Sequence, residues 1–195
     1  MSKQELMDEL VDEVGQCQRC RLWERAKKAV AGEGSLDASL MLIGEAPGYW
    51  EDVKGRPFVG AAGRLLDELL SSIDLNRRDV YISNIIKHRP PNNRDPRKDE
   101  VEACSPYLDR QIRTIRPSIL LTLGRHSAKY VLSTVDVEMK GITEVRGRIY
   151  VGKLFGFMVR VMPTFHPAAA LYNPEYRSAL EEDFQRVKKE LETLA

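Results

Sequence analysis

Three cysteines and one histidine have the spacing of a metal-binding set. Cys17 and Cys20 form a CxxC pair, and Cys104 stands alone at the start of a later predicted helix. A metal site needs a fourth ligand, and His88 lies in the loop before the helix that carries Cys104. Such a set suits structural zinc, and thiolates also hold iron–sulfur clusters. The residues alone therefore favour a metal, with zinc ahead of an iron–sulfur cluster.

Two other interpretations of the cysteines are open at this point. A CxxC can be a redox pair, but thioredoxin-like motifs lie where a strand leads into a helix, whereas this pair follows a predicted helix. Three reduced, buried cysteines without any metal would also fit the sequence. The odd number of cysteines argues against a disulfide framework.

The composition is typical of a globular domain. The chain has 195 residues, 43% hydrophobic and 30% charged, which is enough for one domain with a substantial core. No apolar run approaches the roughly eighteen residues of a membrane helix, and the acidic, amphipathic N-terminus is not a signal peptide. We therefore expect a cytoplasmic protein without a membrane partner.

The charge is distributed unevenly along the chain. A formal net charge of +1 gives no whole-protein electrostatic case for nucleic acid. The segment from Lys87 to Lys98 is different, because it holds five Lys or Arg residues against one acid. A basic loop of this kind is a weak indication of phosphate binding.

Hydrophobic periodicity predicts helices that alternate with short apolar strands. The expected helices cover about residues 3–14, 61–73, 98–115 and 174–194, with a short helix in LGRHSAKYVL; the expected strands are 39–43, 80–84 and 119–123, followed by a hairpin of 148–151 and 157–162 around GKLFG. This order indicates a mostly parallel sheet covered by helices on both faces. We find no linker or repeat, so we expect a single α/β domain over residues 1–195.

Ligands of such sheets bind where the strands end. The loops that leave the carboxyl ends of the predicted strands are GEAPGYWED, NIIKHRPPNNR, LGRHS and MPTFHPAAALYNP. These loops also have the most unusual compositions in the chain. In the first of them, Tyr49 and Trp50 stand among two glycines, one proline and three carboxylates. Topology and composition therefore place the candidate site at the same edge of the sheet.

Five segments, in order, resemble the family 4 uracil-DNA glycosylases. They are GEAPGYWEDVKGRPFVGAAGRLL, VYISNIIKHRPPNNRDP, EVEACSPYLDRQI, LLTLGRHSA and FHPAAAL. The resemblance implies the uracil-DNA glycosylase fold, with a central, mostly parallel four-stranded sheet flanked by helices. It also implies a DNA-repair enzyme that flips uracil out of DNA, hydrolyses the N-glycosidic bond and leaves an abasic site. Uracil-containing DNA, single- or double-stranded, would be the partner of a monomer.

The family also implies a structural 4Fe-4S cluster, and one ligand position departs from its pattern. Cys17, Cys20 and Cys104 match family cysteines, whereas His88 stands where the usual KCRPP segment has its cysteine. The resemblance thus implies a cluster held by three cysteines and one histidine, in a subsite formed by the 17–20 loop and the 88–104 segment. Zinc is the alternative. Imidazole in place of thiolate would remove one negative charge and raise the cluster potential.

The resemblance also implies the residues that act on the base. Glu45 would face the sugar or orient a water, although Ala46 stands where the best-known uracil glycosylases have a catalytic aspartate. His166 would donate a hydrogen bond to uracil O2 as negative charge grows on the base. Phe58 would stack on the flipped uracil. Asn84 would accept from N3 and donate to O4, a pattern that cytosine reverses.

Further roles follow from the same resemblance. Glu51 would lie against uracil C5 and help to exclude the thymine methyl group. DNA contacts are expected from Gly60, Gly63, Arg89 and Arg94, with Leu171 as the wedge that enters the duplex. His126 matches no catalytic position, and we interpret it as a helix N-terminal or packing residue.

Two rival functions share these residues. A uracil-DNA cross-linking protein would become covalently joined to the sugar through a histidine, but RPPNNRDP contains no histidine and the motif reads GEAPG, not GEQPG. A catalytically inactive, metal-stabilised DNA-binding module is the second rival. The presence of Glu45, Asn84 and His166 argues against it.

Overall fold

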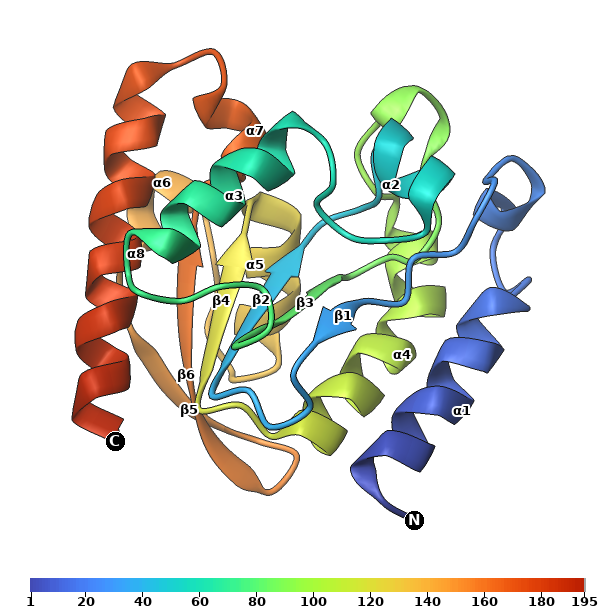
Figure 1. Cartoon of the computed structure of the whole chain (residues 1–195), viewed down its shortest axis with the longest axis horizontal. Helices are drawn as coiled ribbons and strands as arrows, with labels where there is room; N and C mark the ends of the chain where they lie inside the picture. The colour runs from blue at the N-terminus through green and yellow to red at the C-terminus, as the bar shows by residue number, and fades with distance from the viewer. Residues whose placement is uncertain (195) are drawn as a thin grey trace.

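The architecture is a sheet covered by helices on both faces. The computed structural model describes residues 1–194, which hold a six-stranded sheet of order β1-β3-β2-β4-β6-β5 (Figure 1). The strands are β1 (Glu33–Gly34), β2 (Leu40–Gly44), β3 (Tyr81–Asn84), β4 (Ile119–Leu123), β5 (Tyr150–Leu154) and β6 (Phe157–Thr164). The strands β3, β2, β4 and β6 are parallel, and β1 and β5 pair antiparallel at the two edges. The expected parallel four-stranded centre is confirmed, and two antiparallel edge strands extend it.

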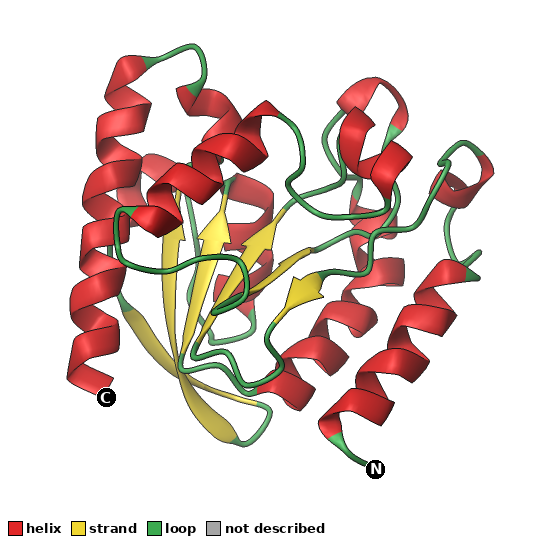
Figure 2. Cartoon of the chain, in the orientation of Figure 1, coloured by secondary structure: helices red, strands yellow, loops and turns green. Residues whose placement is uncertain are grey.

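Alternation along the central strands divides the core into two layers. In β2, Met41 and Ile43 pack with the helices α1 (Lys3–Gly15), α4 (Lys98–Ile115) and α5 (Arg125–Ser133). Leu40 and Leu42 point the other way, because successive strand residues face opposite sides, and they pack with α3 (Ala61–Ser71) and α8 (Pro174–Leu194). Figure 2 shows the helices in red on both sides of the yellow strands.

The remaining helical segments are short and lie in the loops. They are α2 (Tyr49–Lys54), α6 (Ile142–Val145), α7 (Pro167–Ala170) and the 3-10 turns Arg21–Glu24 and Pro91–Asn93. None of them was predicted, because a single turn carries too little periodicity to detect. Both α2 and α7 lie at the edge of the sheet where the parallel strands end (Figure 1). Among residues 1–194, no helix combines the length and the apolar character needed to cross a membrane.

The long elements agree with the sequence, whereas the hairpin differs. The predicted helices 98–115 and 174–194 and the strand 119–123 have the bounds observed. The segment GKLFG was expected to separate the hairpin strands, but β5 continues through Leu154. Phe155 and Gly156 alone make the turn, with φ values of 49° and 91°. Two central residues with positive φ match the twist of paired strands, so a two-residue turn is sufficient.

Candidate active site

A cavity of about 380 Å³ lies at the carboxyl edge of the sheet. Its lining includes all five residues predicted to act on the base: Glu45, Glu51, Phe58, Asn84 and His166. Glu45 follows β2, Asn84 ends β3 and His166 follows β6. The ends of three parallel strands therefore bring together side chains that are far apart in sequence.

The aromatic wall of the cavity is built on a constrained backbone. Phe58 is buried and has a φ of 51°, which is rare for a residue with a side chain. Arg77 donates hydrogen bonds to the carbonyl groups of Pro57 and Phe58. Gly44 lies against the phenyl ring, because a Cβ there would come within 2.7 Å of it. The ring of Phe58 is thus fixed at this wall of the cavity.

Asn84 has a buried acceptor that the protein does not use. Within residues 1–194, its Oδ1 atom has no hydrogen-bond partner although the residue is buried. Leaving such a group unpaired typically costs roughly 1–3 kcal/mol. Because Asn84 lines the cavity, a ligand with an N–H group would satisfy this oxygen.

The backbone of Asn84 is held by a buried lysine that the sequence analysis overlooked. Lys87 Nζ donates to the carbonyl oxygen of Asn84 at 2.8 Å, to Ser83 Oγ at 2.6 Å and to Gln111 Oε1 at 2.8 Å. Burial lowers the pKa of Lys87 to about 8. The signal available in the sequence was a lysine directly after the two apolar residues Ile85 and Ile86.

His166 is arranged as a hydrogen-bond donor towards the cavity. Its Nδ1 atom accepts a hydrogen bond from the Ala168 backbone N–H at 3.1 Å. Burial lowers the pKa of His166 to about 4, and the charge of Glu51 only partly opposes this shift. The imidazole is therefore neutral near pH 7, with its proton on Nε2 because Nδ1 is an acceptor.

Glu45 points to the beginning of α5. Its Oε1 atom accepts a hydrogen bond from the His126 backbone N–H at 2.9 Å. Burial raises the pKa of Glu45, while the bond from His126 opposes this shift. Gly124 leaves room for the carboxylate, since a Cβ there would come within 2.4 Å of Oε1. The carboxylate of Glu45 is thus partly buried and fixed in direction.

Asp95 and His126 extend this arrangement, and the sequence analysis gave neither a role at the site. Single ligand atoms of Glu45, Asp95 and His126 all lie within 4.8 Å of one another. Asp95 Oδ2 is 3.4 Å from His126 Nε2, and Asp95 also pairs with Arg125. The prediction that His126 is a helix N-terminal residue agrees with its position in the first turn of α5. Its contact with two carboxylates goes beyond that prediction.

Glu51 holds the loop around the cavity together. Its Oε2 atom accepts from the Gly48 N–H at 3.1 Å, and Oε1 accepts from the N–H groups of Val59 at 2.8 Å and Gly60 at 3.1 Å. Both oxygens are therefore engaged by the backbone. Glu51 lines the cavity as expected, and its contacts indicate a positioning role in addition to the predicted position near uracil C5.

Gly63, which is a predicted DNA contact, lies at a close approach between a helix and a loop. Gly63 is buried in α3, and a Cβ at this position would lie 1.8 Å from the carbonyl oxygen of Phe58. Glycine is required here so that the helix can approach the loop that carries Phe58. Gly63 therefore has a packing role, and its contact with DNA stays a prediction. Gly60, at the beginning of α3, is half-buried and remains a predicted DNA contact.

The other predicted DNA contacts differ in whether their side chains are hydrogen-bonded within the protein or exposed. Arg94 forms hydrogen bonds to both carboxylate oxygens of Glu100, at 2.8 and 2.5 Å. Arg89 donates to the amide oxygen of Asn93 at 2.7 Å. Leu171 is 40% exposed just after α7, and its neighbour Tyr172, which the sequence analysis did not consider, is 91% exposed.

The predicted metal ligands lie outside the lining of the first cavity. Cys17, Cys20 and Cys104 belong to one hydrophobic cluster, and a second cavity of about 550 Å³ is lined by Cys17 and His88. Burial raises the pKa of Cys104 to about 11, and the nearby thiols of Cys20 and Cys17 add to this shift. The three thiols are therefore close enough to interact.

The distances between the ligand atoms of Cys17, Cys20, His88 and Cys104 indicate which metals fit them. Among residues 1–194, the one set of three or more potential ligand atoms within 4.8 Å of one another is that of Glu45, Asp95 and His126. No three of Cys17, Cys20, His88 and Cys104 are that close. Tetrahedral zinc, with Zn–S bonds of about 2.3 Å, needs sulfur atoms about 3.8 Å apart. In this structure the ligand atoms of the set are thus spaced more widely than those around a bound zinc ion.

Fold and site together define an α/β protein with a polar cavity at the carboxyl edge of a parallel sheet. The family model described as "Uracil DNA glycosylase superfamily" matches residues 31–192. The chain is 54% identical to the type-4 uracil-DNA glycosylase of Saccharolobus solfataricus, over 95% of this chain and 86% of that protein. It is 46% identical to the type-4 enzyme of Archaeoglobus fulgidus, over 94% and 92%, and 41% identical to that of Thermotoga maritima, over 96% and 95%. The chain belongs to the uracil DNA glycosylase superfamily and, within it, to the type-4 uracil-DNA glycosylases, which confirms the resemblance found in the sequence.

Proposed function

We propose that this protein is a DNA-repair glycosylase that removes uracil from DNA and leaves an abasic site. The observation that carries the proposal concerns Asn84, which lines the cavity together with Phe58 and His166. Its buried Oδ1 atom has no hydrogen-bond partner within residues 1–194. Type-4 uracil-DNA glycosylases are also the relatives to which the chain is 41–54% identical. No divalent cation is needed for the reaction proposed below.

Base recognition follows from the hydrogen-bonding groups of the cavity. The Oδ1 atom of Asn84 accepts from uracil N3–H, and the amide nitrogen donates to O4. Cytosine has an acceptor at N3 and a donor at C4, so it would leave buried groups unpaired. Phe58 provides the ring face for the flipped base, and stacking of this kind is worth about 1–3 kcal/mol per base. Glu51 stands near C5, where thymine carries its methyl group.

Bond cleavage needs charge stabilisation on two sides of the glycosidic bond. The C1′–N1 bond breaks and its electron pair goes to uracil, while the oxygen of a water molecule bonds to C1′. The carboxylate of Glu45 stabilises the positive charge on the sugar and orients that water. The Nε2–H group of His166 donates to O2 of the departing uracil anion, which later takes up the proton released by the water. His166 thus acts by electrostatic stabilisation, without giving up its own proton.

The metal subsite has a structural role in this proposal. Cys17, Cys20, His88 and Cys104 would hold a 4Fe-4S cluster, because their ligand atoms are spread more widely than a zinc ion allows. The reaction moves no electrons, so a redox role is not required. The ligands come from three remote segments, and joining them fixes the loop that follows β3.

The contact with DNA would involve the rim of the cavity. Leu171, with Tyr172 beside it, forms the wedge that fills the space left by the flipped base. Gly60 and Arg89 contact the phosphate backbone, whereas Arg94 is engaged with Glu100 and contributes less. The protein acts on uracil-containing DNA as a monomer.

The test uses an oligonucleotide with one uracil, incubated with the protein in EDTA and then treated with hot alkali. Strand cleavage at the uracil supports the proposal, a protein–DNA adduct indicates the cross-linking reaction, and an unchanged strand indicates an inactive binding module. The matched oligonucleotide with thymine should stay intact. Undiminished activity in Glu45→Ala, Asn84→Ala and His166→Ala alike would overturn the site.

Base selectivity tests the assignment of Asn84 separately. A protonated carboxyl group at this position, or one with a bridging water, can present the reversed pattern of donors and acceptors. Asn84→Asp should therefore slow uracil excision and improve the relative acceptance of cytosine. An unchanged ratio of uracil to cytosine excision rates would show that specificity resides in backbone groups.

A further inference from the structure

Two exposed aromatic side chains on α2 have no role in the chemistry described above. Tyr49 is 46% exposed and Trp50 is 54% exposed. They follow Pro47 and Gly48, which line the cavity. The rings meet edge to face, with centroids 5.1 Å apart and planes at 81°. Two large rings at the rim of the site leave apolar surface uncovered, and such a surface commonly marks a binding site.

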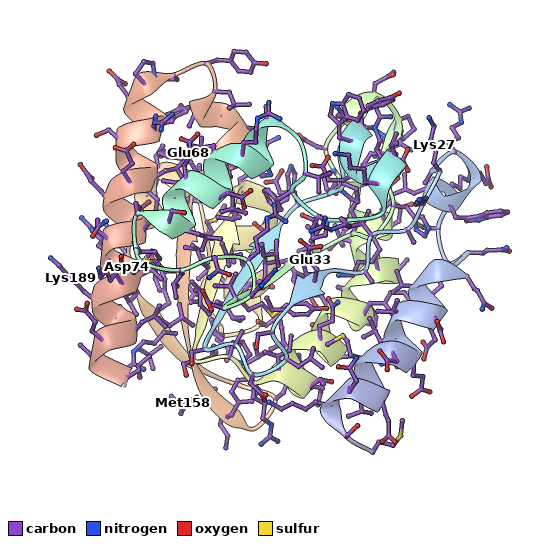
Figure 3. The ribbon with its side chains drawn as sticks, viewed as in Figure 1. Lys27, Glu33, Glu68, Asp74, Met158 and Lys189 are labelled. Atoms are coloured by element: carbon purple, nitrogen blue, oxygen red, sulfur yellow. The ribbon has the colours of Figure 1, made fainter. Side chains whose placement is uncertain are left out.

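Two cations accompany these rings. Lys27 Nζ lies 5.4 Å from the centroid of the Tyr49 ring, and the Arg89 guanidinium carbon lies 5.2 Å from it. Between residues 1 and 194, no carboxylate forms a salt bridge with either cation. Figure 3 shows Lys27 beside α2, at the same edge of the molecule. Tyr49 thus holds two positive charges that are free to pair with an anion.

In the described part of the chain, the neighbouring acids form no ion pair with these two cations. Glu51 directs both carboxylate oxygens to backbone N–H groups. Asp52 is buried and accepts from the N–H groups of Lys27 and Lys28. The carboxylates therefore point to the backbone, and the side chains gathered around α2 at the surface are aromatic or positively charged.

Trp50 lies between the cavity rim and the beginning of α3. A Cβ built on Gly60 would lie 3.6 Å from Trp50 Cδ1. The cations lie on Tyr49 and not on Trp50, so the indole is available for another planar group. A stacking ring next to free cations is the arrangement by which proteins bind single-stranded nucleic acid. Bases in a duplex already stack on one another, so only an unpaired base offers its face.

We propose that the α2 surface, made of Lys27, Tyr49, Trp50 and Arg89, binds single-stranded DNA next to the flipped uracil. Trp50 stacks on an unpaired neighbouring base, and Lys27 and Arg89 pair with the phosphates on either side of it. This proposal rests on the proposed function and adds to it a preference for uracil in unpaired DNA.

The first experiment measures contact with Trp50 directly. The chain has two tryptophans, Trp23 and Trp50, so Trp23→Phe leaves Trp50 as the single indole. A single-stranded oligonucleotide without uracil should quench its fluorescence, because stacking on a base brings the indole into van der Waals contact. Absence of quenching at an oligonucleotide concentration that saturates binding would overturn the proposal. This measurement needs no catalysis, so it stays decisive if uracil excision is absent.

The second experiment compares substrates. Trp50→Ala should raise KM for uracil in single-stranded DNA by about 5- to 100-fold, as expected for one lost stacking contact, with a smaller effect on a duplex with a G·U pair. Met158→Ala is the matched control, because Met158 is 62% exposed and lies on the hairpin at the far end of the molecule (Figure 3). Equal losses on both substrates, or no loss on either, would overturn the proposal.

Salt dependence tests the cations. Each phosphate contact contributes a slope of about 0.7 to the dependence of log affinity on log salt for single strands. Lys27→Ala and Arg89→Ala should each reduce the slope by about that amount, and Arg113→Ala, remote from the cavity on α4, should not. Unchanged slopes in both variants would contradict the phosphate contacts. Wild-type protein that binds single strands with this salt dependence but excises no uracil would refute the proposed function. The proposal that the α2 surface binds single-stranded DNA would still hold.

Discussion

The imidazole of His166 stacks on the phenyl ring of Phe58, with ring centroids 5.5 Å apart and planes inclined by 22°. This contact joins the loop after β6 to the loop between α2 and α3. The group proposed to hold the base and the group proposed to stabilise its charge therefore form one unit. A change that moves Phe58 should also move His166.

The first prediction concerns His166. Replacing one preorganised donor to a developing negative charge typically lowers kcat by about 10²- to 10³-fold, and we expect a loss of this size in His166→Ala. Single-turnover excision rates measure it, with His126→Ala as a comparison of the same residue type. A loss below tenfold would show that His166 does not face uracil O2.

The pH dependence follows from the low pKa of the same imidazole. Burial lowers the pKa of His166 to about 4 from the ordinary value of 6.5. Between these values the unfolded chain binds more protons than the native protein, so this residue makes the free energy of unfolding fall as the pH drops from 6.5 to 4. His166→Asn should lack this component in urea unfolding at a series of pH values. Identical slopes in both proteins would contradict the assignment.

The second prediction concerns Asp95 as a positioning residue. Burial raises the pKa of Glu45, and the negative charge of Asp95 raises it further. If ionised Glu45 is the active form, the acid limb of kcat/KM reports its pKa. Asp95→Asn removes one of the causes, so the limb should move to lower pH. Asp99→Asn, an exposed acid at the start of α4, is the control, and a limb that stays in place would exclude this role of Asp95.

The third prediction concerns the close approach at Gly63. A Cβ there would lie 1.8 Å from the Phe58 carbonyl oxygen, so Gly63→Ala should displace the loop that carries the ring. Overpacking of this kind typically costs about 1–3 kcal/mol of the free energy of unfolding. Gly15→Ala is the matched control, because a Cβ there meets nothing within 4 Å. Equal melting temperatures in both variants would show that the helix adjusts without strain.

The fourth prediction concerns the metal ligands. His88→Cys should retain fold and activity and shift the visible spectrum of anaerobically purified protein towards an all-thiolate cluster. Cys17→Ala should lose iron and melt at a lower temperature. Its affinity for DNA should fall more than the rate of its chemical step. Iron and zinc content, melting curves and DNA binding measure these effects. Iron-free protein with an unchanged melting temperature and DNA affinity would refute the structural role, and stoichiometric zinc after iron-replete expression would refute the choice of metal.

The sequence by itself determined the central architecture. Periodicity located the apolar strand of residues 119–123 and the helix of residues 98–115. In long elements, the spacing of apolar residues along the chain follows the face that is buried. The edge of the sheet that carries the site also followed, since the loops after parallel strands meet at one edge. The ordered motifs identified the family and the residues expected in the cavity.

Only the tertiary structure decided how individual side chains are used. Glu45 meets His126, 81 residues away, and Glu51 turns its oxygens to the backbone of the next loop. Gly63 packs against the carbonyl oxygen of Phe58, and within residues 1–194 the buried Oδ1 atom of Asn84 has no hydrogen-bond partner. The physical reason is that hydrogen bonds and close approaches between remote segments depend on the direction of each side chain after packing, which no local pattern encodes.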